Sequence, residues 1–353
     1  MQPPKPDLAR RDLLHRLPKV GLHRHLEGSL RLETLVEIAK TNNIGVPART
    51  VEEMRALVTM ANRRGDNHAY LQKFNTLRLF YRTPEIIHRF AYEAVADAAA
   101  DNVRYLELRF TPRALASVSG FPFEQVTDWV CDAVQRSAAV HNIMVRIILS
   151  MNRHEAVSIG EKIAQVAVDR AGQGVVGLDI GGDEASYSAR PFGPLFIHAK
   201  QSGLGITMHA GEWSGAASVR DAIENWSADR IGHGVRVVED SEVAALARDR
   251  GVVFEVCPTS NLQSGVVPHI GVHPLRDMFY LGLKVTLNTD NTGVSGVTLT
   301  DEVATIMDGL GFTLRDIKQM QRTACQAAFL TEAERAALLQ RIGAELDEFP
   351  DEI

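Results

Sequence analysis

The chain has 353 residues, of which 45% are hydrophobic and 23% are charged. This usage is typical of a soluble globular protein, and a chain of this length can bury a large core without disulfide or metal support. The net charge of −6 gives no attraction for nucleic acid. The three cysteines, Cys131, Cys257 and Cys325, are scattered and odd in number, which favours a reducing compartment.

The first 19 residues are rich in proline and then in charge, with Arg10, Arg11 and Asp12 close together. This stretch lacks the apolar core of a secretory signal peptide. No apolar run in the sequence is long enough to span a bilayer. We therefore expect a cytoplasmic protein with no membrane partner.

The first predicted strand covers residues 20–23 and leads into His23-Arg24-His25. Side chains two residues apart in a strand point to the same face, so His23 and His25 can reach one metal ion. A lone His-x-His is more often an ordinary surface or core pair. The metal interpretation therefore depends on what the rest of the chain supplies.

Helical patterns follow the opening strand over residues 30–41, 51–60, 70–81 and 85–100. This region is longer than one strand-to-strand crossover needs. We interpret residues 29–100 as the first helix region together with a helical insertion, or lid, which could cover a site beside His23 and His25.

From about residue 102 the sequence alternates between predicted strands and predicted helices. Apolar runs without strict alternation fit parallel strands that are buried on both faces. With the opening strand there are about eight, which predicts one α/β domain over residues 1–353, a (β/α)8 TIM-type barrel with a helical insertion after the first strand. The later predicted strands are 103–110, 144–151, 175–180, 205–209, 229–232, 252–256 and 284–289. The helices expected between and after them are 124–141, 156–171, 194–202, 216–225, 241–250 and a mostly helical tail over 299–346.

Reactive side chains stand at the ends of five of these strands, and strand ends form the active site in such barrels. The groups are His23 and His25, Gly181 to Glu184, His209 to Glu212, Gly232 to Gly234, and Asn288 to Asn291. Catalytic zinc takes nitrogen and carboxylate ligands and keeps an open position for water. His23, His25, His209 and Asp290 would supply such a set.

Two further residues suit acid–base chemistry. Glu212 follows His209 by three residues and could act as a proton shuttle. His233, flanked by glycines, suits a second acid or base, or an electrostatic partner of the activated water. Each residue alone has an ordinary interpretation, such as a structural histidine, a surface carboxylate or, for Asp290, a helix cap. The remaining histidines, including His154, His269 and His273, are assigned no role.

Taken together, the motifs resemble the adenosine deaminase family of zinc hydrolases from about residue 18 to about residue 330. The stretches that carry the resemblance are 18–28, 175–184, 208–212, 230–234, 257–261 and 287–290. The resemblance implies a (β/α) barrel, one zinc ion per chain, and hydrolytic removal of the 6-amino group of an adenine ring. It implies a small purine nucleoside or base as the partner, with water attacking C6 and ammonia leaving.

By position, the resemblance makes His23, His25, His209 and Asp290 the zinc ligands. It makes Glu212 the proton donor to ring nitrogen N1 and His233 the residue that orients the water and helps to deprotonate it. The remaining substrate contacts that it implies are His25, Glu27, Gly182 and Asn291.

Two departures bear on the substrate. The adenosine enzymes usually carry Asp where Glu27 stands, and Glu there resembles adenine deaminases and aminodeoxyfutalosine deaminases. Many members carry a second Asp where Asn291 stands, although many bacterial adenosine deaminases have Asn, whose amide can donate to N7. The stretch Cys257 to Asn261 leans towards the adenosine branch. We expect adenosine or 2′-deoxyadenosine, with adenine, aminodeoxyfutalosine and N6-methyl-AMP as alternatives.

Two other classes of protein are alternatives on the same barrel fold. A dinuclear hydrolase on this barrel would need a bridging ligand, typically a lysine at the end of the fourth strand, and residues 178–184 contain none. A non-catalytic purine-binding protein would be expected to lose Glu212 or a metal ligand, and none is lost. The sequence does not predict the oligomeric state.

Overall fold

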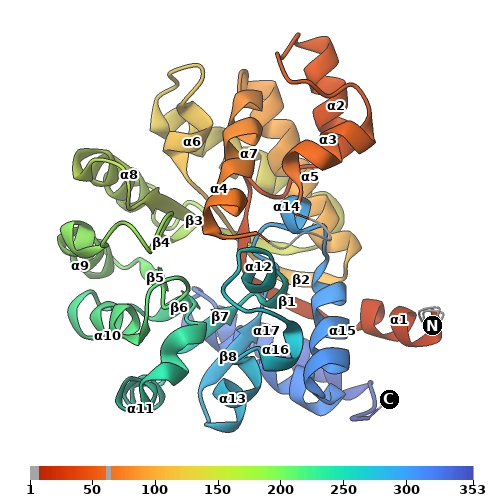
Figure 1. Cartoon of the computed structure of the whole chain (residues 1–353), viewed down its shortest axis with the longest axis vertical. Coiled ribbons are helices and arrows are strands. Elements are labelled where there is room, and N and C mark those ends of the chain that lie inside the picture. The colour runs from red at the N-terminus through yellow and green to blue at the C-terminus, as the bar shows by residue number, and fades with distance from the viewer. Residues whose placement is uncertain (1–7, 61–64, 353) are drawn as a thin grey trace.

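The fold was analysed in a computed structural model that describes residues 8–60 and 65–352. Eight parallel strands follow one another in chain order around a barrel, with helices outside it (Figure 1). The strands are β1 (Lys19–His25), β2 (Val103–Phe110), β3 (Met144–Asn152), β4 (Val175–Gly181), β5 (Gly205–Ala210), β6 (Arg230–His233), β7 (Val253–Val256) and β8 (Lys284–Leu287). The predicted (β/α)8 TIM-type fold is therefore confirmed.

The first and last strands meet at a seam that places site residues side by side. Arg24 and Asp290 form a parallel bridge, in which the His25 N–H donates to the Asp290 carbonyl at 2.8 Å. The Asn288 side chain takes the place of further backbone pairing, because its Oδ1 accepts the N–H groups of Leu22 and His23. This seam explains why β8 ends at Leu287, two residues before the predicted end.

Helices surround the barrel and join its strands (Figure 1). Those before and around the first three strands are α1 (Leu8–Arg16), α2 (Leu32–Thr41), α3 (Val51–Val58), α4 (Asn67–Leu77), α5 (Pro84–Ala100), α6 (Pro112–Ala116) and α7 (Phe123–His141). Those that follow are α8 (Val157–Asp169), α9 (Gly193–Gln201), α10 (Ala216–Asn225), α11 (Ser241–Arg250), α12 (Pro258–Gln263), α13 (Leu275–Tyr280) and α14 (Thr292–Ser295). The tail forms α15 (Leu299–Leu310), α16 (Leu314–Ala327) and α17 (Glu332–Asp347). Short 3₁₀ turns are η1 (Arg78–Phe80), η2 (Arg190–Phe192), η3 (Val235–Glu239) and η4 (Ile270–Val272).

Local chemistry sets many of these boundaries. Helix α11 begins where the Asp240 carboxylate accepts the N–H groups of Glu242 and Val243, and it ends at Gly251, whose φ of +67° suits glycine. Helices α15, α16 and α17 each begin with a capping box. The predicted helix over 70–81 divides into α4 and the turn η1.

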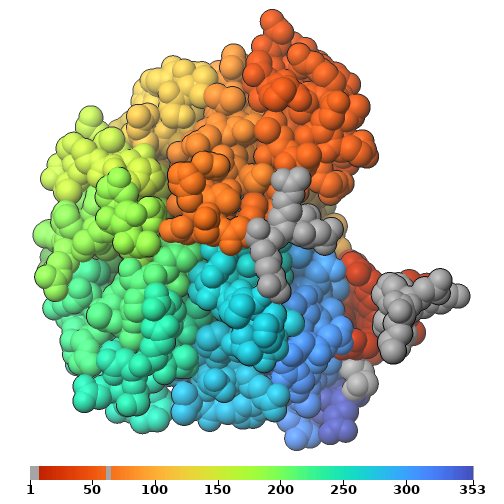
Figure 2. All heavy atoms as spheres, viewed as in Figure 1, coloured from red at the N-terminus to blue at the C-terminus, as the bar shows by residue number. Residues whose placement is uncertain are grey.

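The predicted insertion corresponds to the segment between β1 and β2, which holds α2 to α5. Helix α4 lies near the centre of the view, close to α12 and α14, and Figure 2 shows the orange atoms of this segment against the green and cyan segments. The Asn67 amide bonds Asp183 at 3.4 Å and Tyr70 contacts Ser260 at 3.2 Å, which fixes this proximity. Residues 1–7, 61–64 and 353 of the predicted single domain lie outside the described residues.

Within the described residues, no helix combines the length and the apolar character that crossing a membrane would require. The strands are almost wholly buried, as the apolar runs predicted.

Candidate metal centre and active site

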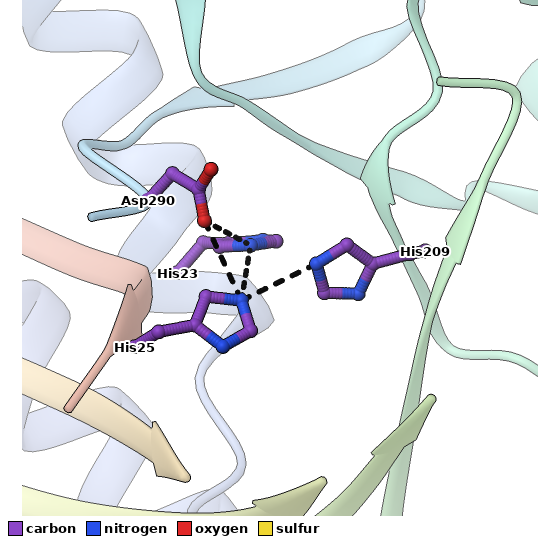
Figure 3. A group of neighbouring side chains, drawn as sticks. All are labelled: His23, His25, His209 and Asp290. Atoms are coloured by element: carbon purple, nitrogen blue, oxygen red, sulfur yellow. Dashed lines mark hydrogen bonds and ion pairs between the residues drawn. The ribbon is translucent and has the colours of Figure 1, made fainter. Parts of the chain in front are cut away.

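Four predicted ligands converge at one end of the barrel (Figure 3). His23 and His25 come from β1, His209 from β5, and Asp290 from the turn after β8. The Nε2 atom of His25 lies 3.3 Å from the Nε2 atoms of both His23 and His209. Asp290 Oδ1 lies 3.5 Å from His23 Nε2 and 3.4 Å from His25 Nε2. The fold thus brings together all four side chains that the sequence proposed as ligands.

The hydrogen bonds on the far side of these rings test whether a cation fits. His23 Nδ1 meets Glu255 Oε2 at 2.8 Å, and His209 Nδ1 meets Asp179 Oδ1 at 3.0 Å. With Nδ1–H donated to a carboxylate, each Nε2 presents a lone pair to the centre. Tetrahedral ligands at ~2.0–2.1 Å from an ion stand about 3.3–3.4 Å apart. Lone pairs that face one another at this spacing fit a bound divalent cation.

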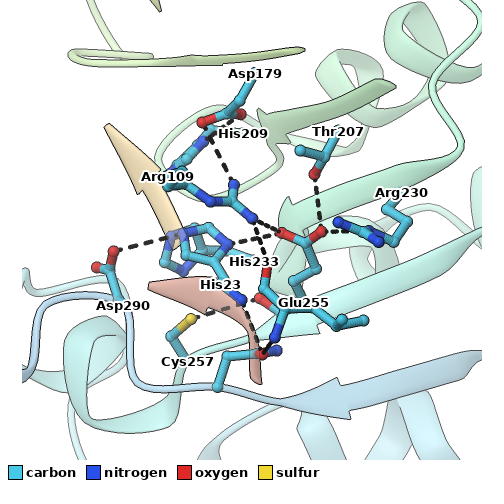
Figure 4. A network of polar contacts seen from close by, with 12 residues as sticks. His23, Arg109, Asp179, Thr207, His209, Arg230, His233, Glu255, Cys257 and Asp290 are labelled. Atoms are coloured by element: carbon cyan, nitrogen blue, oxygen red, sulfur yellow. Dashed lines mark hydrogen bonds and ion pairs between the residues drawn. The ribbon is translucent and has the colours of Figure 1, made fainter. Parts of the chain in front are cut away.

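A buried charge network supports these histidines from beneath (Figure 4). Glu255 accepts hydrogen bonds from Arg109 at 2.6 Å, from Arg230 at 2.6 Å and from the Thr207 hydroxyl at 3.0 Å. Burial alone would raise the pKa of Glu255, but the Arg109 and Arg230 guanidinium groups hold it well below its usual range. Glu255 therefore stays ionised and fixes the orientation of His23.

Asp179 orients His209 in the same way as Glu255 orients His23. Its Oδ2 accepts the Ser150 hydroxyl at 2.8 Å and lies 3.4 Å from Arg109 Nη1. Against burial, which raises the pKa of Asp179, the neighbouring His209 and Arg109 hold it well below its usual range. One arginine thus links the carboxylates that orient two of the proposed ligands.

Two residues of the site adopt a backbone conformation that L-amino acids rarely take. His233 has φ +58° and Asp290 has φ +59°, both in the left-handed region. In Asp290 this turn aims the carboxylate at the histidines, where Oδ2 also accepts the Ser260 hydroxyl at 2.6 Å and the Tyr70 hydroxyl at 3.2 Å. Strain of this kind concentrates at functional sites.

A cavity of about 430 Å³ opens beside the four ligands, a size that suits a small molecule. Its walls come from the strand ends and from helix α4, which contributes Tyr70, Leu71, Phe74 and Asn75. The predicted site residues that line it are His25, Glu27, Gly182, His209, Glu212, His233, Asp290 and Asn291. Of the predicted site residues, only His23 is not among its walls.

Glu212 has the environment of a carboxyl group that keeps its proton. It is 4% exposed, and its carboxyl makes no hydrogen bond to the part of the chain that the structure describes. Burial raises the pKa of Glu212 well above its usual range, and the charges of Asp290 and Glu184 raise it further. His233 Nδ1 lies 3.8 Å from Glu212 Oε1, beyond hydrogen-bond distance.

The loop after β5, which carries Glu212, is held by Glu184, a strand-end carboxylate to which the sequence analysis assigned no individual role. Glu184, at the end of β4, accepts backbone N–H groups of Gly211, Glu212, Trp213 and Ser214 at 2.7–3.0 Å. Ionised carboxylates accept several backbone N–H groups strongly. The loop conformation, and with it the direction of the Glu212 side chain, is therefore fixed by Glu184.

The predicted substrate contacts keep unused polar atoms at the cavity. Glu27 accepts the Thr111 N–H at 2.7 Å through Oε1, while its buried Oε2 has no partner among the described residues. Asn291 donates to the Tyr70 hydroxyl at 3.1 Å, and its Oδ1 is likewise unpaired there. Gly182 has φ +87°, and a Cβ there would lie 3.0 Å from His154 Nδ1.

Sequence reasoning missed several residues that line or build this site. His154 follows the end of β3 and lines the cavity, although it was assigned no role. Its position after a barrel strand could have identified it. Tyr70 could not be found that way, because it lies on a helix far from any strand end and reaches Asp290 only through the fold.

The family comparison agrees with this geometry. The model of the family described as Adenosine deaminase matches residues 18–345. The chain belongs to the adenosine deaminase family. An adenosine deaminase of Shewanella loihica is 34% identical over 325 residues, which cover 91% of this chain and 97% of that protein.

Solved structures agree with the family assignment. An amidohydrolase of Burkholderia ambifaria, solved with bound Zn, superposes with a TM-score of 0.87 at 29% identity, covering 98% of this chain and 95% of that one. The N6-methyl-AMP deaminase of Arabidopsis thaliana gives a TM-score of 0.84 at 26% identity, covering 96% and 100%. This chain is therefore a hydrolase of the class that acts on carbon–nitrogen bonds in cyclic amidines.

Proposed function

We propose that this protein is a zinc-dependent deaminase that converts adenosine and 2′-deoxyadenosine to inosine and 2′-deoxyinosine, with release of ammonia. The observation that carries the proposal is the convergence of three Nε2 atoms and the Asp290 carboxylate beside a cavity. The same cavity is lined by Glu212, whose carboxyl makes no hydrogen bond to the described residues. The adenosine deaminases that are about 34% identical over most of their length support this substrate.

His23, His25, His209 and Asp290 would hold one divalent ion, which we propose to be zinc. When bound, such an ion supplies Lewis acidity, which lowers the pKa of water at its open position. The choice of zinc is supported by the nitrogen and carboxylate donor set and by the zinc in the Burkholderia amidohydrolase.

We assign Glu212 as the proton donor to the ring nitrogen N1. Hydrolysis adds water at C6 and expels the 6-amino group as ammonia, and a proton on N1 makes C6 more electrophilic. A donor must carry its proton at neutral pH, which the raised pKa of the buried Glu212 supports. His233 and Asp290 would orient the attacking water through hydrogen bonds.

The substrate would be held by His25, Glu27, Gly182 and Asn291. The unpaired Oε2 of Glu27 suits a ribose hydroxyl, which can donate to it. The backbone of Gly182 can approach the purine closely because no side chain intervenes. Asn291 would face N7, with its amide turned to donate.

We also propose that residues 1–353 form one barrel domain in which residues 29–100 hold the first helix region after β1 and act as a lid. Tyr70, Leu71 and Phe74 of α4 line the cavity, so this segment would exclude water from a bound nucleoside. The size of the cavity and the net negative charge support a small-molecule substrate rather than nucleic acid. The three free cysteines support a cytoplasmic location.

The test is ammonia release by the purified, zinc-loaded protein. Adenosine, 2′-deoxyadenosine, adenine, aminodeoxyfutalosine and N6-methyl-AMP are compared by kcat/KM, with zinc content measured on the same sample. We expect the highest kcat/KM for adenosine or 2′-deoxyadenosine.

A preference for one of the other three compounds would keep the chemistry and overturn the substrate. Absence of ammonia from all five, with zinc bound, would overturn the deaminase assignment and favour a purine-binding protein. Equilibrium dialysis with adenosine then measures binding directly.

A further inference from the structure

A chain of three buried polar side chains stands behind the cavity. His273 follows η4, Asn261 lies in α12, and His233 ends β6. His273 Nε2 lies 3.2 Å from Asn261 Oδ1, and Asn261 Nδ2 lies 3.1 Å from His233 Nδ1. All three residues are at most 2% exposed. Hydrogen bonds between such buried groups must be matched donor to acceptor.

The donor-to-acceptor order of these hydrogen bonds is fixed by a backbone group next to His273. The Leu275 N–H can only donate, and it points at His273 Nδ1 at 3.1 Å. His273 Nδ1 therefore carries a lone pair. Burial lowers the pKa of His273 to about 3, so the ring is neutral at neutral pH and its proton sits on Nε2.

That proton orients the next side chain. His273 Nε2–H donates to Asn261 Oδ1, which leaves the Asn261 amide nitrogen facing His233. An amide NH₂ can only donate, so His233 Nδ1 must accept. A neutral imidazole that accepts at Nδ1 carries its proton at Nε2.

We propose that His273 and Asn261 are positioning residues that fix His233 as its Nε2–H tautomer. The tautomer itself follows from the hydrogen bonds alone, and only its effect on turnover rests on the proposed function. As long as the hydrogen bonds from His273 to Asn261 and from Asn261 to His233 are kept, neither ring nitrogen of His233 has a lone pair free to accept a proton. It then donates a hydrogen bond and does not act as the base that the family resemblance implied.

The measurement is the tautomer of His233 in the zinc-loaded protein. Protein labelled with ¹⁵N in its histidines is observed by long-range ¹H–¹⁵N correlation, which distinguishes an Nε2–H ring from an Nδ1–H ring. The His233 signals are assigned by their loss in His233→Gln. We expect Nε2–H in the unmodified protein, and an Nδ1–H ring there would overturn the proposal.

Asn261→Asp is the sharpest variant, because it keeps the shape and replaces the donor with an acceptor. The carboxylate would accept from both rings, so His233 should change to Nδ1–H. An exchanged tautomer at a catalytic histidine costs orders of magnitude in turnover. We expect kcat on adenosine to fall by about 100-fold or more with KM changed far less. An unchanged His233 tautomer in this variant would overturn the proposal.

Two substitutions at His273 separate its hydrogen bond from its bulk. His273→Leu removes the donor and should give a mixture of His233 tautomers, whereas His273→Gln can still donate to Asn261 and should restore Nε2–H. His269→Leu in the same loop, where the side chain is exposed, is the matched control. Equal His233 spectra in His273→Leu and the control would overturn the proposal, even if none of the tested purines is a substrate.

Discussion

Glu184 Oε2 accepts the backbone N–H of Glu212 at 2.9 Å, and the two Glu184 oxygens together bind four consecutive N–H groups of that loop. One carboxylate from the end of β4 therefore sets the conformation of the segment that carries the proposed proton donor. The relationship is indirect, since Glu184 touches the backbone and leaves the Glu212 side chain free to face the cavity.

Replacing Glu184 with glutamine should disturb this loop while keeping its size. The amide NH₂ cannot accept, so some of the four N–H groups would lose their partner. We expect kcat on the preferred purine to fall about 10- to 100-fold, with the zinc content unchanged. Steady-state kinetics with metal analysis measure this, using the exposed Glu224→Gln as control. Unchanged kcat would show that the loop holds its shape without Glu184.

Replacing Glu212 with glutamine removes the transferable proton and little else. Because none of the proposed ligands is altered, the variant should retain zinc. Its kcat should fall by about 10²- to 10⁴-fold. Parallel measurements of zinc content and ammonia release test this. Full activity would remove Glu212 from the assignment.

Glu255→Gln tests the carboxylate that orients His23. Loss of the hydrogen-bond partner of a ligating histidine typically lowers metal affinity about 10- to 100-fold. We therefore expect Glu255→Gln to lower the zinc affinity by about this factor, as measured by competition with a chelator. The free energy of unfolding of the metal-free variant should also fall by about 3 kcal/mol, because the buried Arg109 and Arg230 guanidinium groups each lose one of two counter-charges. Glu239→Gln, a surface carboxylate paired with Arg236, serves as control. Equal metal affinity of the two variants would contradict the role given to Glu255.

The pH dependence of stability should report on Glu302, a buried carboxyl in the first turn of α15. Burial raises the pKa of Glu302 to about 8 from 4.5. Between those values the folded state holds a proton that the unfolded state releases, so the free energy of unfolding falls as pH rises. The expected contribution is ~3 kcal/mol between pH 5 and pH 8. Urea unfolding at several pH values should show a flatter profile for Glu302→Gln, and parallel profiles would argue against this shift.

The parallel arrangement of the strands explains why most site residues at the carboxyl ends of the strands, here called the rim, could be predicted from the sequence. Their carboxyl ends lie on one edge, so short motifs after each strand converge without further information. His23, His209 and Asp290 were therefore proposed together although they lie far apart in the chain. The strand ends themselves were predicted to within two residues. The end of β8 is two residues early because the Asn288 side chain replaces backbone pairing at the seam.

The residues behind the rim could not be predicted by the same reasoning. His273 was assigned no role, since nothing in its neighbourhood shows that Asn261 would face it. Tyr70 and Glu184 act through partners on other segments, and such contacts depend on how the helices pack. Hydrogen-bond direction, which decides the tautomer of a histidine, is a property of the assembled network and not of a local motif.

The seam between β1 and β8 also bears on how the protein is made. His23 and His25 leave the ribosome well before Asp290 does. The barrel cannot close, and the four proposed ligands cannot meet, until β8 has docked beside β1. A nascent chain therefore offers a metal ion only an incomplete set of ligands. Binding of an ion by all four proposed ligands therefore has to follow the synthesis of β8 and its docking beside β1.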